Sequence, residues 1–340
     1  MSRFKAKKNI INIFMGLAAF ASANAFIASS AQAENTTLRI ASVNPATTES
    51  FVVAERVAKR ITERTDGRVT FQLFPSGQLG TTNDTIEQAS QGQPVIGFVS
   101  ASAMANFGVP EFSILEGPFL TDNNEEAERL ANSALLKSLY DKLAESAGIR
   151  VLSINWFDGA RHMIGDKAYP EPSDLKGVLM RVPPVETWIK TFDPLQVVAT
   201  SVEAGEVYSA LSQGVVTAAE APLTGLRASR WYEPAKHITT TGHFNLFTGW
   251  VMSENVFGKL TTEDQAVMLE EFKKGGQELT KLSEGLGEEI RQEFEAAGVT
   301  FHEANIEAYR QATADFYVNF SDWSEELHKK MRAAATGNDQ

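Results

Sequence analysis

The chain has 340 residues, which predicts about two domains, and its 43% hydrophobic and 22% charged residues are typical of a soluble globular protein and exclude intrinsic disorder. The formal net charge of -12 argues against a nucleic-acid ligand, because binding to phosphates needs clustered Lys and Arg. The absence of cysteine excludes disulfides, thiolate metal sites, cysteine nucleophiles and a lipid anchor on cysteine.

The first 33 residues follow the order of a cleavable export signal. Basic residues from Arg3 to Lys8 precede an apolar run over 10–27, and small residues then end in Ala31-Gln32-Ala33. A membrane anchor is the alternative, since the apolar run is close to the lower length limit of about 17–20 residues. Polar residues interrupt the run and a cleavage site follows it, so we expect residues 1–33 to be removed and the mature chain to be soluble in the periplasm.

Hydrophobic periodicity predicts alternating strands and helices in the first half of the mature chain. Alternating apolar residues predict strands over 37–42 and 69–73, and a four-residue apolar spacing predicts a helix over 50–66 between them. A strand, a helix and a strand in this order are typical of a parallel βαβ unit. The pattern continues with a helix over 83–90, a strand over 95–99, a long helix over 124–147 and a strand over 149–156.

The second half repeats the alternation and then becomes helical. A second α/β unit is predicted from a strand over 178–182, helices over 184–191 and 203–212, and a strand over 215–218. Farther on, Thr262 can cap a helix that runs to Ala297, with Gly275-Gly276 and Gly285 as places where it can bend. At about 50 Å, from a rise of 1.5 Å per residue, this helix is longer than one domain needs, so we expect it to bridge two lobes. A final helix is predicted over 306–335.

The sequence carries none of the familiar catalytic motifs. Signatures of nucleophile-elbow, dinucleotide, phosphate-loop and zincin sites are absent. His237 and His243 could in principle share a metal, but no further ligand lies at a suitable spacing between them, so we expect structural roles and no metal site. Asp158 and His162 could form the acid-base pair of a secreted α/β hydrolase or lyase, although no nucleophile or metal set accompanies them. We therefore expect no catalytic residues and no cofactor.

Two arginines lie where predicted strands end among small or proline residues. Arg161 follows Gly159-Ala160, and Arg181 precedes Val182-Pro183. In open α/β sheets, ligands bind beyond the carboxyl ends of the strands. A guanidinium group there can form a bidentate pair with a carboxylate. From position alone, surface or interlobe salt bridges are an equally good interpretation of both residues.

Six short motifs that fall in one order along the chain decide between these interpretations. They are Phe74-Pro75-Ser76-Gly77-Gln78-Leu79-Gly80, Gly117-Pro118-Phe119-Leu120, Gly159-Ala160-Arg161-His162, Asp174-Leu175-Lys176-Gly177, Arg181-Val182-Pro183 and Glu206-Val207-Tyr208-Ser209-Ala210-Leu211. Together this ordered set resembles the solute-binding proteins of tripartite ATP-independent periplasmic (TRAP) transporters, the C4-dicarboxylate-binding branch and its relatives. The resemblance extends from Leu38 to about Trp323.

The resemblance implies a two-lobed α/β fold of the periplasmic binding protein type, in which the lobes close around a ligand and a long helix spans both. Lobe I would hold residues 34–157 and 247–285, and lobe II residues 158–246 and 286–335. The family also implies that Arg181 pairs with the ligand carboxylate and that Arg161 is the second basic contact. Further positions that commonly line the family's pocket fall at Asn44, Ser100, Ser102, Trp156 and Phe247.

The chain departs from the family pattern at several pocket positions. Family members often show Gln-Glu-Asn-Pro where this chain has Ala219-Glu220-Ala221-Pro222, so an amide that commonly helps to hold the carboxylate is missing. Ala204 replaces a common aromatic residue, and Ser100 and Ser102 stand where sugar-acid binders can place charged residues. Because a buried ligand hydroxyl without a partner costs about 1–3 kcal/mol, we expect a small or partly apolar organic acid rather than sialic acid.

These observations favour an extracytoplasmic solute receptor, not an enzyme. It would capture a small organic anion between its lobes, with Trp156 and Phe247 packing the apolar part of the ligand. It would then deliver the ligand to TRAP membrane permease subunits. We expect a monomer that binds no nucleic acid. A ligand-sensing subunit for a membrane receptor is an alternative that the sequence leaves open.

Overall fold

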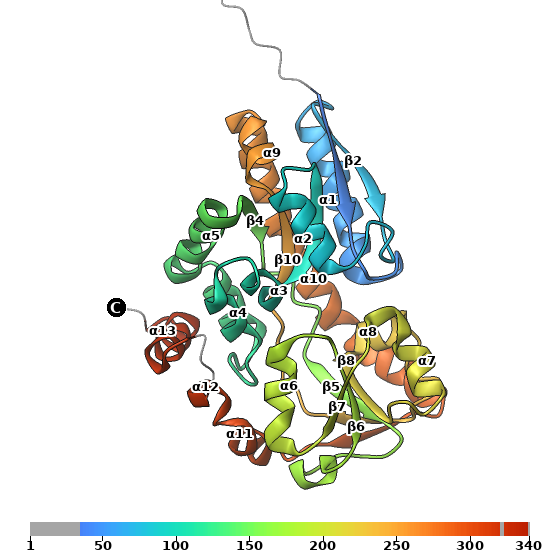
Figure 1. Ribbon diagram of the computed structural model, residues 1–340. Helices are drawn as coiled ribbons and strands as arrows, with labels where there is room; N and C mark the ends of the chain where they lie inside the picture. Colours follow the sequence, from blue (N-terminus) through green and yellow to red (C-terminus); the bar gives the residue numbers. More distant parts are fainter. Residues whose placement is uncertain (1–34, 320–322, 339–340) are drawn as a thin grey trace, which may run out of the picture. The chain divides into compact units, whose positions relative to one another are not determined.

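Two β-sheets, each covered by helices, organise the chain (Figure 1). The computed structural model describes residues 35–319 and 323–338, so the predicted export signal over 1–33 lies outside the described residues. Within the described ranges, no helix combines the length and the apolar character that crossing a bilayer requires. The two sheets confirm the predicted α/β class.

The first sheet has five strands in the order β2-β1-β3-β10-β4. Their bounds are Thr36–Ala41 (β1), Val69–Phe74 (β2), Val95–Ser100 (β3), Ile149–Ser153 (β4) and Thr248–Ser253 (β10). β1 pairs in parallel with β2, as the predicted βαβ unit requires, and the connecting helix α1 runs over Glu49–Arg64. Val53, Val57 and Ile61, at four-residue spacing on α1, are fully buried against this sheet's core. β10 enters from far along the chain and pairs antiparallel with β3 and β4.

The second sheet has six strands in the order β11-β9-β5-β8-β6-β7. Their bounds are Arg161–Gly165 (β5), Leu179–Val182 (β6), Val198–Ser201 (β7), Ala218–Pro222 (β8), His237–Thr240 (β9) and Thr300–Glu303 (β11). The strand predicted over 215–218 is displaced in the structure, where Val215 is 53% exposed and β8 begins at Ala218. Residues 218–222 form the strand because they, unlike Val215, are buried between β5 and β6.

The helices correct two sequence predictions. Their bounds beyond α1 are Thr82–Ser90 (α2), Ala101–Ala105 (α3), Asn124–Ala131 (α4), Ala134–Ala147 (α5), Glu186–Phe192 (α6), Val207–Ser212 (α7), Leu223–Ala228 (α8), Glu254–Lys259 (α9), Thr262–Ala296 (α10), Ile306–Thr313 (α11), Phe316–Asn319 (α12) and Glu325–Thr336 (α13). The helix predicted over 124–147 is two helices, because the Ser133 hydroxyl accepts a hydrogen bond from Leu136 N–H and starts α5 anew. The helix predicted over 306–335 is divided into α11, α12 and α13, and its residues 320–322 lie outside the described part.

The long helix α10 confirms the prediction of a connection between the two halves. It runs for 35 residues, packs on α1 beside the first sheet, and contacts α8 and β11 of the second sheet. The predicted bend sites Gly275 and Gly276 serve close packing, since a Cβ on Gly276 would lie only 2.6 Å from the carbonyl oxygen of Asn155. Two sheets joined by one long helix form the two lobes.

The C-terminal helices suggest a revised lobe boundary. α13 packs on α4, and Met331 and Ala334 share a hydrophobic core with Leu130 of α4 and Val151 of β4. We propose that residues 325–336 belong with lobe I, although the sequence placed them in lobe II. Phe316, Tyr317 and Trp323 belong to the same core, and the other boundaries remain predictions.

Candidate ligand-binding site

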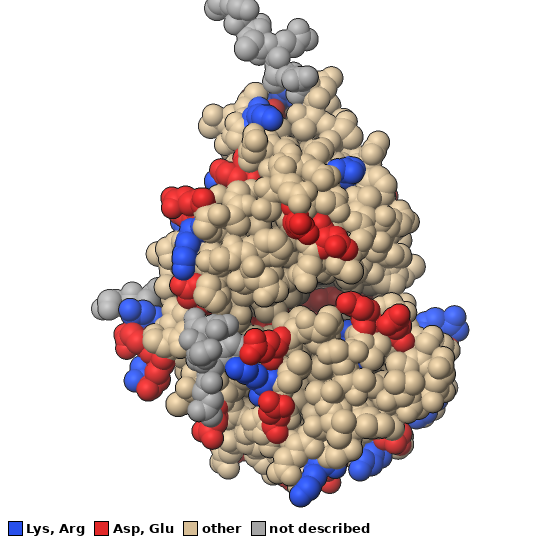
Figure 2. Space-filling view, viewed as in Figure 1, with Lys and Arg blue, Asp and Glu red and all other residues tan. Residues whose placement is uncertain are grey.

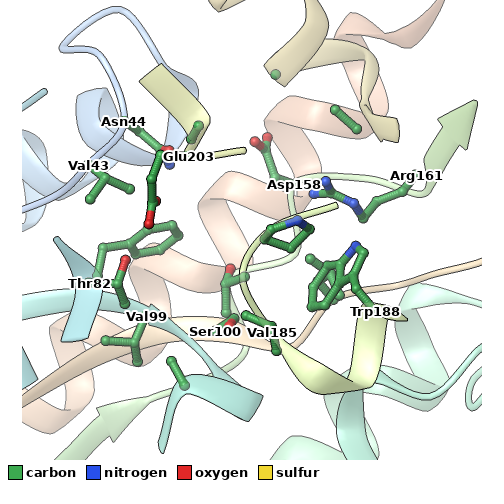
Figure 3. Close-up of a pocket in the computed structure, with 18 of the residues that line it drawn as sticks. Val43, Asn44, Thr82, Val99, Ser100, Asp158, Arg161, Val185, Trp188 and Glu203 are labelled. Carbon is green, nitrogen blue, oxygen red and sulfur yellow. The ribbon is translucent and has the colours of Figure 1, made fainter. Parts of the chain in front are cut away.

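A cavity of about 320 Å³ lies between the two sheets and is lined by residues of both (Figure 3). Asn44 follows β1, Ser100 ends β3, and Arg181 is the next-to-last residue of β6. The cavity therefore lies at the carboxyl ends of parallel strands, where open α/β sheets bind ligands.

Arg181 presents a buried cation that no carboxylate neutralises directly. Its side chain is 5% exposed, and its Nε donates a hydrogen bond to the Val202 carbonyl oxygen at 2.9 Å. Among the described residues, no carboxylate oxygen lies within 4.0 Å of its guanidinium group, which lies 5.7 Å from the ring centre of Trp231. Burial lowers the pKa of Arg181 to about 10, so the side chain stays charged at neutral pH. This cation can accept an anionic ligand group.

Arg161 also lines the cavity, but it already has a carboxylate partner. Its Nε and Nη2 donate to the two carboxylate oxygens of Glu220, with Nη2 at 2.8 Å from Oε1. The sequence placed Arg161 after a strand, whereas the structure places it at the first residue of β5. Because β5 is antiparallel to β8, this first residue pairs with Pro222, the last residue of β8. Arg161 therefore still lies at the cavity end of the sheet.

Glu220 is the centre of a buried polar cluster behind the cavity wall. It is fully buried, accepts a hydrogen bond from Trp188 Nε1 at 3.0 Å, and lies 3.5 Å from His243 Nε2. Burial alone would raise the pKa of Glu220, but the charge and hydrogen bonds of Arg161 lower it to about 2. Glu220 is therefore ionised, and it holds both Arg161 and Trp188 in place at the cavity wall.

Two further carboxyl groups line the cavity. Asp158 follows β4, and its Oδ1 accepts a hydrogen bond from Ser283 of α10 at 2.9 Å. Burial raises the pKa of Asp158 to about 7. Glu203, just after β7, is exposed to the cavity (Figure 3). No cation lies within 4.0 Å of either carboxylate in the described part of the chain.

The structure brings four of the seven sequence-predicted positions together: Arg181, Arg161, Asn44 and Ser100 line the cavity. The other three lie behind it. Trp156 is fully buried, and its Nε1 donates to Ser153 and to the Phe272 carbonyl. Phe247 packs on Phe157 in the core, and the backbone N–H of Ser102 donates to buried Glu116.

The aromatic wall of the cavity comes instead from Trp188, Trp231 and Phe98. Trp188 lies on α6, which starts just after the Arg181-Val182-Pro183 motif. The position of Trp188 shortly after this motif was the sequence signal that could have identified it as a cavity residue. Trp231 and Glu203 lie outside the motifs and gave no local signal.

The cavity lining contradicts the expectation of a weakly polar pocket. Amide or carboxyl side chains line it at Asn44, Asn83, Asn106, Asp158 and Glu203. Hydroxyl groups add to these at Thr48, Thr81, Thr82, Ser100, Ser229 and Thr248. Such a surface offers partners to ligand hydroxyl groups, which removes the argument for a small or partly apolar acid.

The acid-base alternative finds no support in the geometry. Asp158 bonds Ser283, whereas His162 Nδ1 accepts from the Gly242 N–H, and no hydrogen bond joins the two among the described residues. Burial lowers the pKa of His162 to about 4, so its ring is neutral. His237 pairs with His302 at 3.0 Å rather than with His243. Within the described ranges, no group of three metal-ligating side chains occurs.

Comparisons with known proteins agree with this geometry. A family model described as bacterial extracellular solute-binding protein, family 7, matches residues 40–322. A solute-binding protein of Verminephrobacter eiseniae is 31% identical over 245 residues, which is 72% of each chain.

Two solved structures of TRAP periplasmic solute-binding proteins superpose on this chain with a TM-score of 0.84. The protein from Ochrobacterium anthropi, with bound L-fuconate, is 28% identical; the match covers 88% of this chain and 99% of that one. The protein from Actinobacillus succinogenes, with bound L-galactonate, is 26% identical; the match covers 89% of this chain and 100% of that one.

Proposed function

Because the chain belongs to the bacterial extracellular solute-binding proteins of family 7, and is therefore a receptor rather than an enzyme, we propose that it binds an organic carboxylate at Arg181 and delivers it to a TRAP permease. The observation that carries this proposal is the state of Arg181. A buried, charged guanidinium group without a carboxylate partner faces a cavity between two lobes. A ligand carboxylate supplies the missing counter-charge and can form two parallel N–H···O bonds.

The neighbouring residues fit the same role. Arg161 keeps its charge balanced by Glu220 and adds a hydrogen-bond donor at the wall. Asn44 and Ser100 contact the ligand from lobe I, opposite the two arginines of lobe II. Closure of the lobes then surrounds the ligand with groups from both sheets and excludes water, which strengthens the carboxylate pair.

The ligands of the two solved structures described above support a carboxylate. L-fuconate and L-galactonate, bound in the two structures described above, each carry one carboxylate and several hydroxyl groups. This chain offers a free arginine for the former and many amide and hydroxyl groups for the latter. We therefore expect a hydroxylated acid of this kind.

The cellular setting follows from the family and from the export signal. We propose that residues 1–33 are removed and that the mature protein works in the periplasm as a monomer. Its partners are the small organic anion and the TRAP permease subunits. The net charge of -12 argues against nucleic acid as a further partner.

Titration calorimetry of the purified mature protein tests this function. A panel of sugar acids and simple mono- and dicarboxylates should contain a ligand whose affinity falls by about 2–5 kcal/mol in Arg181→Ala, because the ligand charge is then buried without a partner. Arg291→Ala, which removes a half-buried arginine that is paired with Glu295 and lies outside the cavity lining, is the matched control and should leave the dissociation constant unchanged. Equal affinity of the Arg181→Ala variant would refute the assignment.

A further inference from the structure

A buried hydrogen bond joins the two lobes beside the ligand cavity. Figure 2 shows the groove that separates the two halves of the molecule. Glu116 ends the short 3-10 helix Pro110–Glu116 of lobe I, and Thr187 lies on α6 of lobe II. The Thr187 hydroxyl donates to Glu116 Oε2 at 3.2 Å, and both side chains are almost completely buried. Because the two residues come from different lobes, this bond forms only while the lobes lie together.

Glu116 depends on hydrogen bonds from both lobes. Its Oε1 accepts from the backbone N–H of Ser102 at 3.0 Å, and its Oε2 accepts from Thr187. Burial raises the pKa of Glu116, and three hydroxyl groups oppose this rise by hydrogen bonding, namely those of Ser102, Ser100 and Thr187. A buried acceptor that loses its partner costs more free energy than a typical hydrogen bond gains. Each of these donors therefore stabilises Glu116, and among them Thr187 is the donor from lobe II.

Both ends of this contact lie at the wall of the ligand cavity. On the side of lobe I, Ser100 ends β3 and lines the cavity (Figure 3). On the side of lobe II, Thr187 immediately precedes Trp188, which also lines the cavity. A movement of α6 away from lobe I would therefore break the bond to Glu116 and displace part of the cavity wall at the same time.

A second contact between the lobes has replaceable partners. The guanidinium group of Arg227 on α8 pairs with Glu49 on α1. Arg227 Nη1 also lies 3.7 Å from Glu289 and 3.8 Å from Glu293, both on α10. Arg227 therefore keeps carboxylates nearby when Glu49 moves away. The Thr187 hydroxyl has no second acceptor among the described residues, so its bond is lost when the lobes separate.

Resting on the receptor function proposed above, we propose that Glu116 is a positioning residue that ties Ser100 of lobe I to α6 of lobe II and thereby holds the lobes closed around the ligand. The bond from Thr187 contributes only while the lobes are together, so it favours the closed arrangement over the open one. A ligand that both lobes contact can leave only after this bond breaks. We therefore expect the contact to act mainly on the dissociation rate of the ligand.

Spin labels on the two lobes test this contact without any ligand. The chain has no cysteine, so Gln72→Cys on β2 and Gln213→Cys after α7 place one label on each lobe, at exposed positions outside the cavity lining. Pulsed spin-resonance distances then give the ratio of open to closed molecules. Thr187→Val replaces the hydroxyl group by a methyl group of similar size and should raise this ratio at least fivefold. Thr187→Ser keeps the hydroxyl group and should keep the ratio of the labelled parent.

Thr191→Val is the matched control for packing. Thr191 lies one turn farther along α6 and is equally buried, but its hydroxyl group has no hydrogen-bond partner among the described residues. Its replacement should leave the ratio unchanged. Glu116→Gln should raise the ratio. Adding Thr187→Val to Glu116→Gln should raise it by a smaller factor than Thr187→Val does alone, because the two side chains share one contact.

Ligand kinetics give a second measurement on the same variants. The probes are L-fuconate and L-galactonate, the acids bound in the two solved structures described above, and stopped-flow tryptophan fluorescence follows their binding. Thr187→Val should raise the dissociation rate constant at least fivefold and change the association rate constant by less than twofold. Thr187→Ser and Thr191→Val should keep the wild-type rate constants.

The outcomes separate this proposal from the carboxylate receptor. An unchanged ratio in Thr187→Val, or an equal rise in Thr187→Val and Thr191→Val, would overturn the role of Glu116 and leave the receptor intact. Equally fast dissociation from Thr187→Val and Thr187→Ser would assign the effect to packing and overturn it as well. If neither acid binds the wild type, a raised ratio in Thr187→Val still supports the role of Glu116, because the ratio is measured without ligand.

Discussion

Replacing Glu220 by Gln tests the buried cluster that supports the cavity wall. The pKa of Glu220 is about 2, against an ordinary value of 4.5, and this difference corresponds to about 3 kcal/mol of stability at neutral pH. Removing one partner of a buried ion pair costs about 3–5 kcal/mol by an independent estimate. We therefore expect Glu220→Gln to lower the free energy of unfolding by about 3 kcal/mol at pH 7.

The lowered pKa of Glu220 determines how the stability difference between the wild type and the variant changes with pH. Because the folded-state pKa of Glu220 is depressed, its contribution is complete well above pH 4.5 and is lost as the pH falls toward 2. Gln resembles the protonated acid, so the gap between the wild type and the variant should shrink from about 3 kcal/mol at pH 7 to about 1 kcal/mol at pH 3. Groups away from Glu220 cancel in this difference, but His243 does not, because burial lowers its pKa and the charge of Glu220 opposes that shift.

Urea denaturation followed by tryptophan fluorescence at both pH values measures the gap. Glu203→Gln is the matched control, since Glu203 is exposed and has no ion pair among the described residues, and its cost should stay within about 0.5 kcal/mol. A loss below about 1 kcal/mol for Glu220→Gln at pH 7, or a gap that is the same at pH 7 and pH 3, would contradict the assigned role of the pair.

Two further pairs of variants test the packing of α10 and the residues of the cavity wall. Gly276→Ala places a Cβ within 2.6 Å of the Asn155 carbonyl oxygen and should destabilise the fold by about 1–3 kcal/mol. Gly285→Ala, on the same helix, meets nothing within 4 Å and should stabilise the fold by up to about 1 kcal/mol. Thermal melts that rank the two variants in the reverse order would refute this reasoning. Trp188→Phe removes a donor to Glu220 at the cavity wall and should weaken carboxylate binding, while Trp156→Phe, behind the wall, should change the dissociation constant by less than about twofold. Equal losses of affinity by calorimetry would return Trp156 to the site.

The sequence predicted those helices that are specified by their own residues. The apolar spacing of α1 and the length of α10 placed both helices to within about two residues, because an amphipathic helix is specified by its own residues. The predicted cap of α10 was wrong by one residue, since the hydroxyl of Thr261, not of Thr262, accepts the hydrogen bond from Asp264 N–H. The break between α4 and α5 was missed because it depends on one serine whose hydroxyl caps the next turn. The four-residue strands β7, β9 and β11 were missed because their stability comes from partners far along the chain, and β7 even exposes Val198 at the sheet edge.

The binding-site residues show the same difference between local sequence signals and long-range contacts. Arg181 could be found from its motif and from its position before a proline turn at a strand end. The partner of Arg161 could not, since Glu220 is 59 residues away and meets it only through the antiparallel pairing of β5 with β8. Trp156 stands next to Phe157 and Asp158 in sequence, yet it packs against Trp250 while Asp158 reaches the cavity. Residues that are neighbours in the sequence can thus point in different directions, and tertiary packing determines which side chain reaches the cavity.

The Arg161–Glu220 pair explains how an acidic chain keeps a cation available for a ligand. Glu220 attracts Arg181 as well as Arg161, and the electrostatic effect of Glu220 on Arg181 opposes the larger effect of burial. Because Arg161 occupies both carboxylate oxygens, Glu220 stabilises the charge of Arg181 from a distance without covering its guanidinium nitrogens. A direct Arg181–Glu220 bond would hold the cation equally well but would compete with every ligand. Splitting the two functions between two arginines lets one hold the wall together while the other stays open to an anion.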